Sequence, residues 1–164
     1  MRSHRPLSLF LGTVLVLAAA SASAQQTPPP YGPPITLEQA KKVMAGAEAE
    51  AMKNKWNMVV TILDSGGNLV MSQRMDGTQF GSIEVAREKA YSAVAFRRPT
   101  KVWQDLLAQG GANMRLLGLT GASLLDGGIP IVVDGKLIGG IGVSGATGEQ
   151  DAQVARAGAA ALAK

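Results

Sequence analysis

The hydrophobic pattern of this chain predicts two β-hairpins. In the clearer one, the apolar segments Ile129 to Val133 and Leu137 to Ser144 flank the pair Asp134-Gly135. An Asp-Gly pair between apolar segments is the strongest short-range hairpin signal, because both central residues of the tight turn need a positive φ. Glycines interrupt the second segment, which predicts a bulge, a bend or a close approach by a ligand or another part of the backbone.

The second predicted hairpin lies nearer the N-terminus. Trp56 to Leu63 is an uninterrupted apolar and β-branched run, residues 64–68 form the turn cluster Asp-Ser-Gly-Gly-Asn, and apolar character resumes from Leu69 to Gln73. A strand without polar alternation is typical of one that is covered on both faces. We therefore expect the first of these strands to lie in the interior of the sheet.

Apolar residues recur at helical spacing in four further segments. Helices are predicted from Thr36 to Lys53, from Ser82 to Phe96, from Thr100 to Ala108 and beyond Gly148, with Thr36, Ser82 and Thr100 as N-caps. Residues 113–119 are ambiguous, and a brief strand is expected at 123–125. This order of elements predicts an α+β domain with an antiparallel sheet.

The first 24 residues have the pattern of a secretory signal peptide. Arg2 and Arg5 form a basic start, Leu7 to Ala20 an apolar core, and Ala22 to Ala24 a small-residue cleavage signal. The apolar core is shorter than the roughly 18 residues of a membrane span. We therefore expect cleavage after Ala24, a periplasmic or secreted protein, and no stable membrane insertion after cleavage.

Composition narrows the chemistry that remains after cleavage. The sequence contains no cysteine, and its single histidine, His4, lies in the predicted signal peptide. This excludes a Ser-His-Asp triad, a cysteine nucleophile, a zinc site with histidine or cysteine ligands, and disulfides. The net charge of +4 is not gathered into a Lys or Arg block, so nucleic acid is not an expected partner.

The remaining chain is divided into a tether and one domain. Residues 25–35 contain 5 of the 8 prolines and are predicted to be an extended, mobile tether. A single domain is expected at 36–164.

Several short motifs follow one another through this domain. They are Val60 to Asn68, Arg74 to Gly77, Glu88 to Ala90, Asp126 to Ile131 and Ile138 to Gly145, followed by Gln150-Asp151. In this order they resemble the GlcG/HbpS family of haem-binding proteins, which is similar to the C-terminal domain of the PduO cobalamin adenosyltransferases. The resemblance implies a five-stranded antiparallel sheet flanked by helices in profilin-like layers, assembly into homo-oligomers, and, as in several members, binding of haem or another tetrapyrrole.

Haem binding requires an apolar slot, cations near its two carboxylates and, optionally, a ligand to the iron. Met75 lies in a polar loop and Tyr91 lies on the predicted helix that carries Lys89, so these are the less ordinary ligand candidates. Lys89 interrupts a small-residue helix face and needs a partner or a ligand anion if it is buried. The candidate cofactor-binding residues are Arg74, Met75, Asp76, Lys89, Tyr91, Gly127, Gly128, Pro130, Ser144 and Gly145. Arg97, Arg98 and Lys101 are interpreted mainly as solvated charges.

Three functions from different classes remain open at this point. The first is an exported haem-binding carrier or sensor component without turnover. The second is an enzyme for a small carboxylate or hydroxy acid, in which Lys89 and Arg74 hold the anion and Asp76 moves a proton. The third is an oligomeric structural or interaction module whose glycine-rich clefts are subunit contacts.

Overall fold

The structure is a computed structural model and describes residues 27–162, so the predicted signal peptide lies outside the described residues. Its centre is a four-stranded antiparallel sheet of order β2-β1-β4-β3. The strands are β1 (Val59–Asp64), β2 (Leu69–Arg74), β3 (Gly128–Val133) and β4 (Lys136–Ser144). Both predicted hairpins are confirmed, and Asp134 and Gly135 have the positive φ values of the predicted turn, 49° and 72°.

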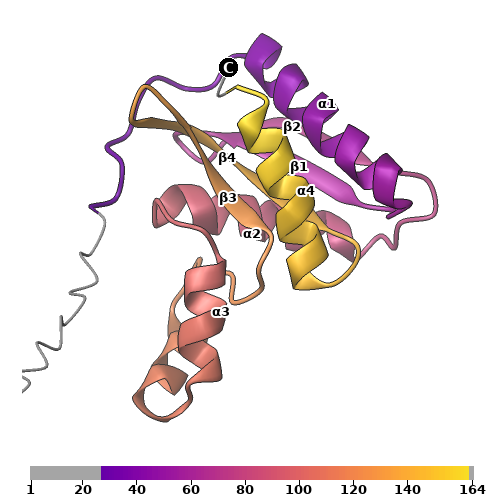
Figure 1. Cartoon of the computed structure of the whole chain (residues 1–164). Coiled ribbons are helices and arrows are strands. Elements are labelled where there is room, and N and C mark those ends of the chain that lie inside the picture. The colour runs from indigo at the N-terminus through magenta and orange to yellow at the C-terminus, as the bar shows by residue number, and fades with distance from the viewer. Residues whose placement is uncertain (1–26, 163–164) are drawn as a thin grey trace, which may run out of the picture.

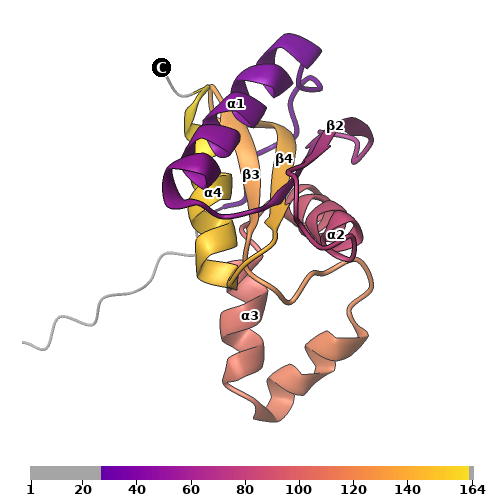
Figure 2. The same cartoon turned by 90° about the vertical axis from the view of Figure 1, so that its right-hand side faces the viewer.

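Helices cover both faces of the sheet (Figures 1 and 2). Helices α1 (Leu37–Asn54) and α4 (Gly148–Ala160) lie side by side on one face, and α2 (Ser82–Ala95) covers the other. Helix α3 (Lys101–Ala108) and the 3-10 helix η1 (Gly111–Gly118) form an arm that extends beyond the sheet. The predicted helices are therefore present, and the ambiguous segment 113–119 falls largely in η1.

One of the three predicted N-caps is confirmed. The hydroxyl of Thr36 accepts a hydrogen bond from the Gln39 backbone N–H (3.2 Å), and the Gln39 side chain accepts one from the Thr36 N–H (3.0 Å). Ser82 lies inside α2, and Thr100 precedes α3 but makes no side-chain cap. Both hydroxyls are used in tertiary contacts instead, which helix-capping patterns cannot reveal.

The prediction of a fifth strand is wrong for the described residues. Ser123 to Leu125 is irregular, and β3 is left as an edge of the sheet. Pro130 lies within β3 and has no N–H to donate, as is typical of edge strands. The sheet therefore ends at β3 on this side.

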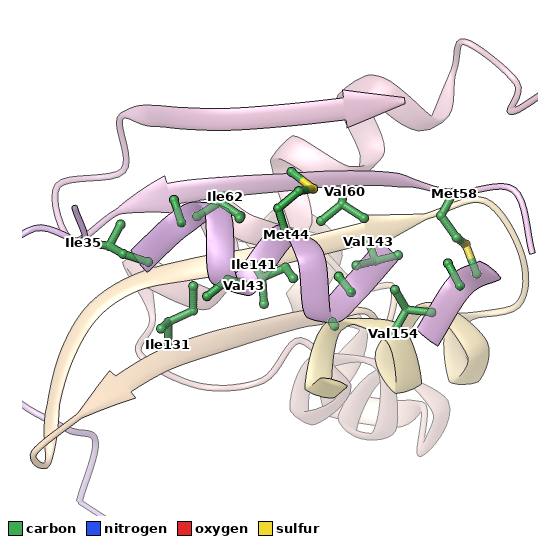
Figure 3. Close-up of a cluster of buried hydrophobic side chains, with 14 of the residues drawn as sticks. Ile35, Val43, Met44, Met58, Val60, Ile62, Ile131, Ile141, Val143 and Val154 are labelled. Atoms are coloured by element: carbon green, nitrogen blue, oxygen red, sulfur yellow. The ribbon is translucent and has the colours of Figure 1, made fainter. Parts of the chain in front are cut away.

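The main core lies between α1, α4 and the sheet (Figure 3). Val43, Ile62, Ile141 and Val154 are fully buried in it. Strand β1 is buried from Val59 to Leu63, which confirms the prediction of a strand covered on both faces. Burial of a large aliphatic side chain stabilises a fold by about 1.5–3 kcal/mol, so this layer is a major source of stability.

The glycines of β4 bring α2 close to the opposite face of the sheet. A Cβ at Gly140 would lie 2.9 Å from the carbonyl oxygen of Ala90, and one at Gly142 would collide with the carbonyl oxygen of Ala86. The predicted close approach to this strand is therefore made by the backbone of α2. These glycines are packing positions that fix the place of α2.

Candidate functional site

Lys89 is buried in an ion pair inside the fold. Its ammonium donates to Asp151 Oδ2 at 2.7 Å and to the carbonyl oxygen of Val143 at 3.0 Å. The side chains of Lys89 and Asp151 are only 2% and 3% exposed. Burial raises the pKa of the Asp151 carboxyl, while the Lys89 ammonium and the backbone N–H of Ala146 act in the opposite direction. The partner that a buried lysine requires is thus supplied by the protein itself.

Gly127 packs tightly against this ion pair, and Gly128 packs against the backbone of Lys89. Gly127 has a φ of 123°, and a Cβ there would lie 2.9 Å from the Lys89 Nζ. The Gly127 N–H donates to Asp126 Oδ1 (2.8 Å), and the Gly128 N–H donates to the hydroxyl of Thr100 (2.9 Å). Both amides are therefore bonded within the fold, and the role of the glycines in the structure is close packing.

Ser144 and Gly145 lie at the far end of β4. The hydroxyl of Ser144, which is buried, lies 3.1 Å from the hydroxyl of Ser82, at the start of α2. A Cβ at Gly145 would collide with the carbonyl oxygen of Asn57, just before β1. The structure thus uses these two residues to join β4 to α2 and to the start of β1.

Arg74, Met75 and Asp76 lie where β2 ends. Arg74 and Asp76 are exposed, whereas Met75 is half-buried and packs against the main core. The Met75 N–H donates to the carbonyl oxygen of Met58 at 2.9 Å. Val59 of β1 pairs with Arg74 of β2 on one side and with Ser144 of β4 on the other. This loop therefore shares one end of the sheet with Ser144 and Gly145.

Tyr91 lies on the outer face of α2, and its side chain is 43% exposed. Two glycines with positive φ flank its ring: a Cβ at Gly67 would lie 3.3 Å from it and one at Gly121 3.1 Å. The ring borders a small cavity of about 360 Å³, which Arg87, Glu88 and Ser123 also line.

A larger groove lies at another place, beside β3. It has a volume of about 1050 Å³, at the upper end of the range for small-molecule sites. Its walls are the N-terminal segment 27–29, residues 97–99 after α2, Val102 and Leu106 of α3, and the β3 residues Ile129, Pro130 and Val132. Pro130 is the one candidate residue from the sequence that lines it.

Two arginines give this groove its charge. The Arg97 guanidinium lies over the Tyr31 ring, 5.3 Å from its centroid, and the Arg98 guanidinium lies 5.1 Å from the centroid of the Trp103 ring. In the part of the chain that the structure describes, neither arginine pairs with a carboxylate. Lys101, by contrast, donates to Asp105 at 2.8 Å. The groove therefore combines apolar walls with two cations that can bind an anionic ligand.

The N-terminal wall of the groove is held by Tyr31. Its hydroxyl donates to the carbonyl oxygens of Val94 (3.0 Å) and Ala95 (3.1 Å) at the end of α2. The Leu137 N–H donates to the carbonyl oxygen of Pro30, and the Gly32 N–H donates to that of Leu137. Residues 30–35, which belong to the predicted tether, are therefore hydrogen-bonded to the start of β4 in the structure.

The candidate residues thus occupy separate places instead of one site. Lys89, Gly127 and Gly128 lie in the interior, Arg74 to Asp76 and Ser144-Gly145 at one end of the sheet, Tyr91 on α2, and Pro130 in the groove. Sequence reasoning assigned Arg97 and Arg98 to the solvated surface. The one signal for them was their position between a helix end and Pro99, because the residue before a proline has a restricted backbone conformation.

The apolar walls of the groove and its two arginines suit an apolar ligand that carries carboxylates. Among residues 27–162, no group of three or more His, Cys, Asp or Glu side chains could hold a metal ion. Within the same residues, no helix has both the length and the apolar character needed to cross a membrane.

Comparison with known proteins identifies relatives over most of the chain. The chain is 41% identical to the protein GlcG of Escherichia coli K12 over 110 residues, and this alignment covers 67% of this chain and 81% of GlcG. The crystal structure of HbpS has a TM-score of 0.72 at 38% identity, covering 80% of this chain and 92% of HbpS. A crystal structure of a PduOC–haem complex has a TM-score of 0.71 at 29% identity, and the match covers 79% of this chain and 95% of the PduOC chain.

These likenesses agree with the order of motifs in the sequence and with the layered fold. The family model described as haem degrading protein HbpS-like matches residues 35–160, which is most of the described structure. The chain therefore belongs to the HbpS-like family.

Proposed function

We propose that this protein is an exported haem-binding protein, a carrier or sensor component, that binds haem in the groove beside β3. The observation that carries the proposal is the pairing of apolar walls with the two arginines that have no carboxylate partner in the described chain. Membership of the HbpS-like family and the likeness to a haem complex of PduOC support haem as the ligand.

The residues of the groove suit the chemistry of haem. Haem is a flat apolar plate with two carboxylates, so it needs an apolar slot and cations at the rim. Val102, Leu106 and Ile129 would contact the plate, and Arg97 and Arg98 would bind the carboxylates through charge-assisted hydrogen bonds. Both guanidinium groups lie against aromatic rings, which restricts their motion before the ligand arrives.

The position of Lys89 argues against the alternative of an enzyme that acts on a small carboxylate. An enzyme for a small carboxylate would need Lys89, Arg74 and Asp76 around one substrate. The Lys89 ammonium already has the Asp151 carboxylate and the Val143 carbonyl as partners, whereas Arg74 and Asp76 are exposed at the end of β2. An anion bound by Arg74 therefore could not reach the Lys89 ammonium without unpacking the interior.

Self-association is also part of the proposal. Phe80 is 81% exposed, Leu117 63% and Leu69 62%, and burial of such side chains between copies of the chain would favour assembly. Sedimentation velocity of the purified protein tests this, with a homo-oligomer as the expected result. A monomer at all concentrations would remove this part of the proposal.

Export is tested separately from binding. The basic start, the apolar run 7–20 and Ala22 to Ala24 predict cleavage after Ala24. Mass spectrometry of the protein from the periplasm or the medium should give a chain that begins at Gln25. An intact chain retained in the cytoplasm would contradict the proposed location.

Haemin titration of the purified protein, followed at the Soret band with a competitor protein present, tests the ligand and its place. We expect saturable binding at about one haem per subunit or subunit pair. The double substitution Arg97→Ala/Arg98→Ala should weaken binding about tenfold or more, while Lys101→Ala, on an exposed cation paired with Asp105, should not. Non-saturating uptake would reject haem, and equal affinity of the two variants would reject the groove.

A further inference from the structure

The proposed haem site has an unusual donor set. None of the residues that line the groove is a histidine, cysteine, methionine or tyrosine. Proteins usually hold haem iron through one of these four side chains. The described walls of the groove therefore supply contacts for the porphyrin plate and its carboxylates but no ordinary ligand for the iron.

The tyrosines of the chain are engaged elsewhere. Tyr31 adjoins the groove through Arg97, but its hydroxyl donates to the carbonyl oxygens at the end of α2. Tyr91 lines the separate, smaller cavity on the outer face of α2. Neither phenol is placed among the groove walls.

The methionines of the described chain also lie away from the groove. Met44 and Met58 are buried in the core between α1 and the sheet (Figure 3), and Met71 and Met75 pack against the same core. The two others are exposed, Met52 on α1 and Met114 on η1, and neither element forms a wall of the groove. His4 lies outside the described residues, in the predicted signal peptide.

We infer that this groove recognises the dicarboxylate porphyrin plate independently of the iron, so that metal-free porphyrin and haem bind with similar affinity. The inference rests on the proposed haem site. Binding then depends on apolar contact with α3 and β3 and on hydrogen bonds from Arg97 and Arg98 to the carboxylates. None of these contacts changes when the iron is removed.

The backbone keeps the two cations in place for this recognition. Arg97, two residues after the last residue of α2, has a φ of 52°, a left-handed conformation that turns the chain sharply there. The Arg97 side chain donates to the carbonyl oxygen of Pro29 at 3.4 Å, and that of Arg98 to the carbonyl oxygen of Phe96 at 3.2 Å. Two guanidinium groups that line the same groove and are held in this way suit a ligand that carries two carboxylates.

Three ligands separate the contribution of the carboxylates from that of the iron. The purified protein is titrated with haemin, with protoporphyrin IX and with protoporphyrin IX dimethyl ester, by quenching of tryptophan fluorescence. We expect the dissociation constants of haemin and protoporphyrin IX to agree within about threefold and that of the ester to be about tenfold or more higher. Arg97→Ala/Arg98→Ala should weaken the two acids equally, and the control Lys101→Ala should change neither.

The possible results separate this inference from the proposed function. If haemin binds about tenfold or more tightly than protoporphyrin IX, with the spectrum of a strongly ligated iron, the inference is overturned and the haem-binding function stands. If the ester binds as well as the free acid, recognition through the carboxylates is overturned while binding of the plate remains. If no porphyrin binds saturably, both the function and the inference are rejected.

Discussion

The Lys89 ammonium and the Asp151 carboxylate lie 2.7 Å apart, although 62 positions separate them in the chain. Lys89 belongs to α2 and Asp151 to α4, and these helices cover opposite faces of the sheet (Figure 2). The pair therefore joins the two outer layers directly. It lies beside Gly127, where a side chain would occupy the space of the ammonium.

Breaking this pair should strongly destabilise the fold. Lys89→Met or Asp151→Asn leaves one member of a buried ion pair without its partner, which typically costs about 3–5 kcal/mol. Urea unfolding followed by tryptophan fluorescence measures the loss. The double substitution Lys89→Met/Asp151→Leu should recover part of it, because neither charge is then left buried. A single variant with the stability of the parent would show that the pair contributes little.

Gly142→Ala should destabilise the contact between α2 and β4. The added Cβ would collide with the carbonyl oxygen of Ala86, and overpacking of this kind costs about 1–3 kcal/mol or more. The matched control is Gly118→Ala in η1, where a Cβ would meet nothing within 4 Å. The thermal midpoint should fall for the first variant alone. Equal midpoints would mean that α2 can shift without cost.

The turn between β1 and β2 should lose stability in acid. Burial acts to raise the pKa of Asp64, but hydrogen bonds from the Asn68 backbone and side chain and from the Gly66 N–H outweigh it and lower that pKa below 3.8. The unfolded chain then binds the proton at higher pH than the folded one. The stabilisation is therefore complete above pH 3.8 and is lost as the pH falls through the folded-state pKa.

Asp64→Asn provides the comparison for this pH dependence. The amide keeps an acceptor oxygen but carries no charge, so the variant should be less stable than the parent near neutral pH, and the difference should narrow below pH 3.8. Urea unfolding midpoints of both proteins, measured from about pH 6 down to the lowest pH at which they fold, test this. This range is chosen because it spans the ordinary carboxyl pKa of about 4. A difference that stays constant with pH would contradict the role of the charge.

Tyr31→Phe should loosen the N-terminal wall of the groove without unfolding the domain. The change removes the hydroxyl that donates to Val94 and Ala95, a loss of about 1 kcal/mol. Hydrogen exchange at the amides of Gly32 and Leu137 should become faster, because those amides bond within this wall. Tyr91→Phe, on the outer face of α2, is the control. Unchanged exchange in both variants would show that other contacts hold the segment.

Local signals allowed much of the fold to be predicted from the sequence. The Asp134-Gly135 turn and the Thr36 capping box each depend on residues a few positions apart, so their patterns can be read directly. The uninterrupted apolar run that contains β1 likewise predicted an interior strand. The hydroxyls of Ser82 and Thr100 were misassigned as caps, because their partners, Ser144 and Gly128, are distant in the chain.

The sequence by itself determined most elements of this protein, their approximate bounds and the family to which it belongs, since these depend on local propensity and on the order of motifs. The tertiary structure alone decided that Lys89 meets Asp151 and that a groove forms from the N-terminal segment, the end of α2, α3 and β3. The physical reason is that a hydrophobic pattern specifies which face of each element is buried but not which elements become neighbours. Charges such as Arg97 and Arg98 therefore acquire a binding role only once those neighbours are known.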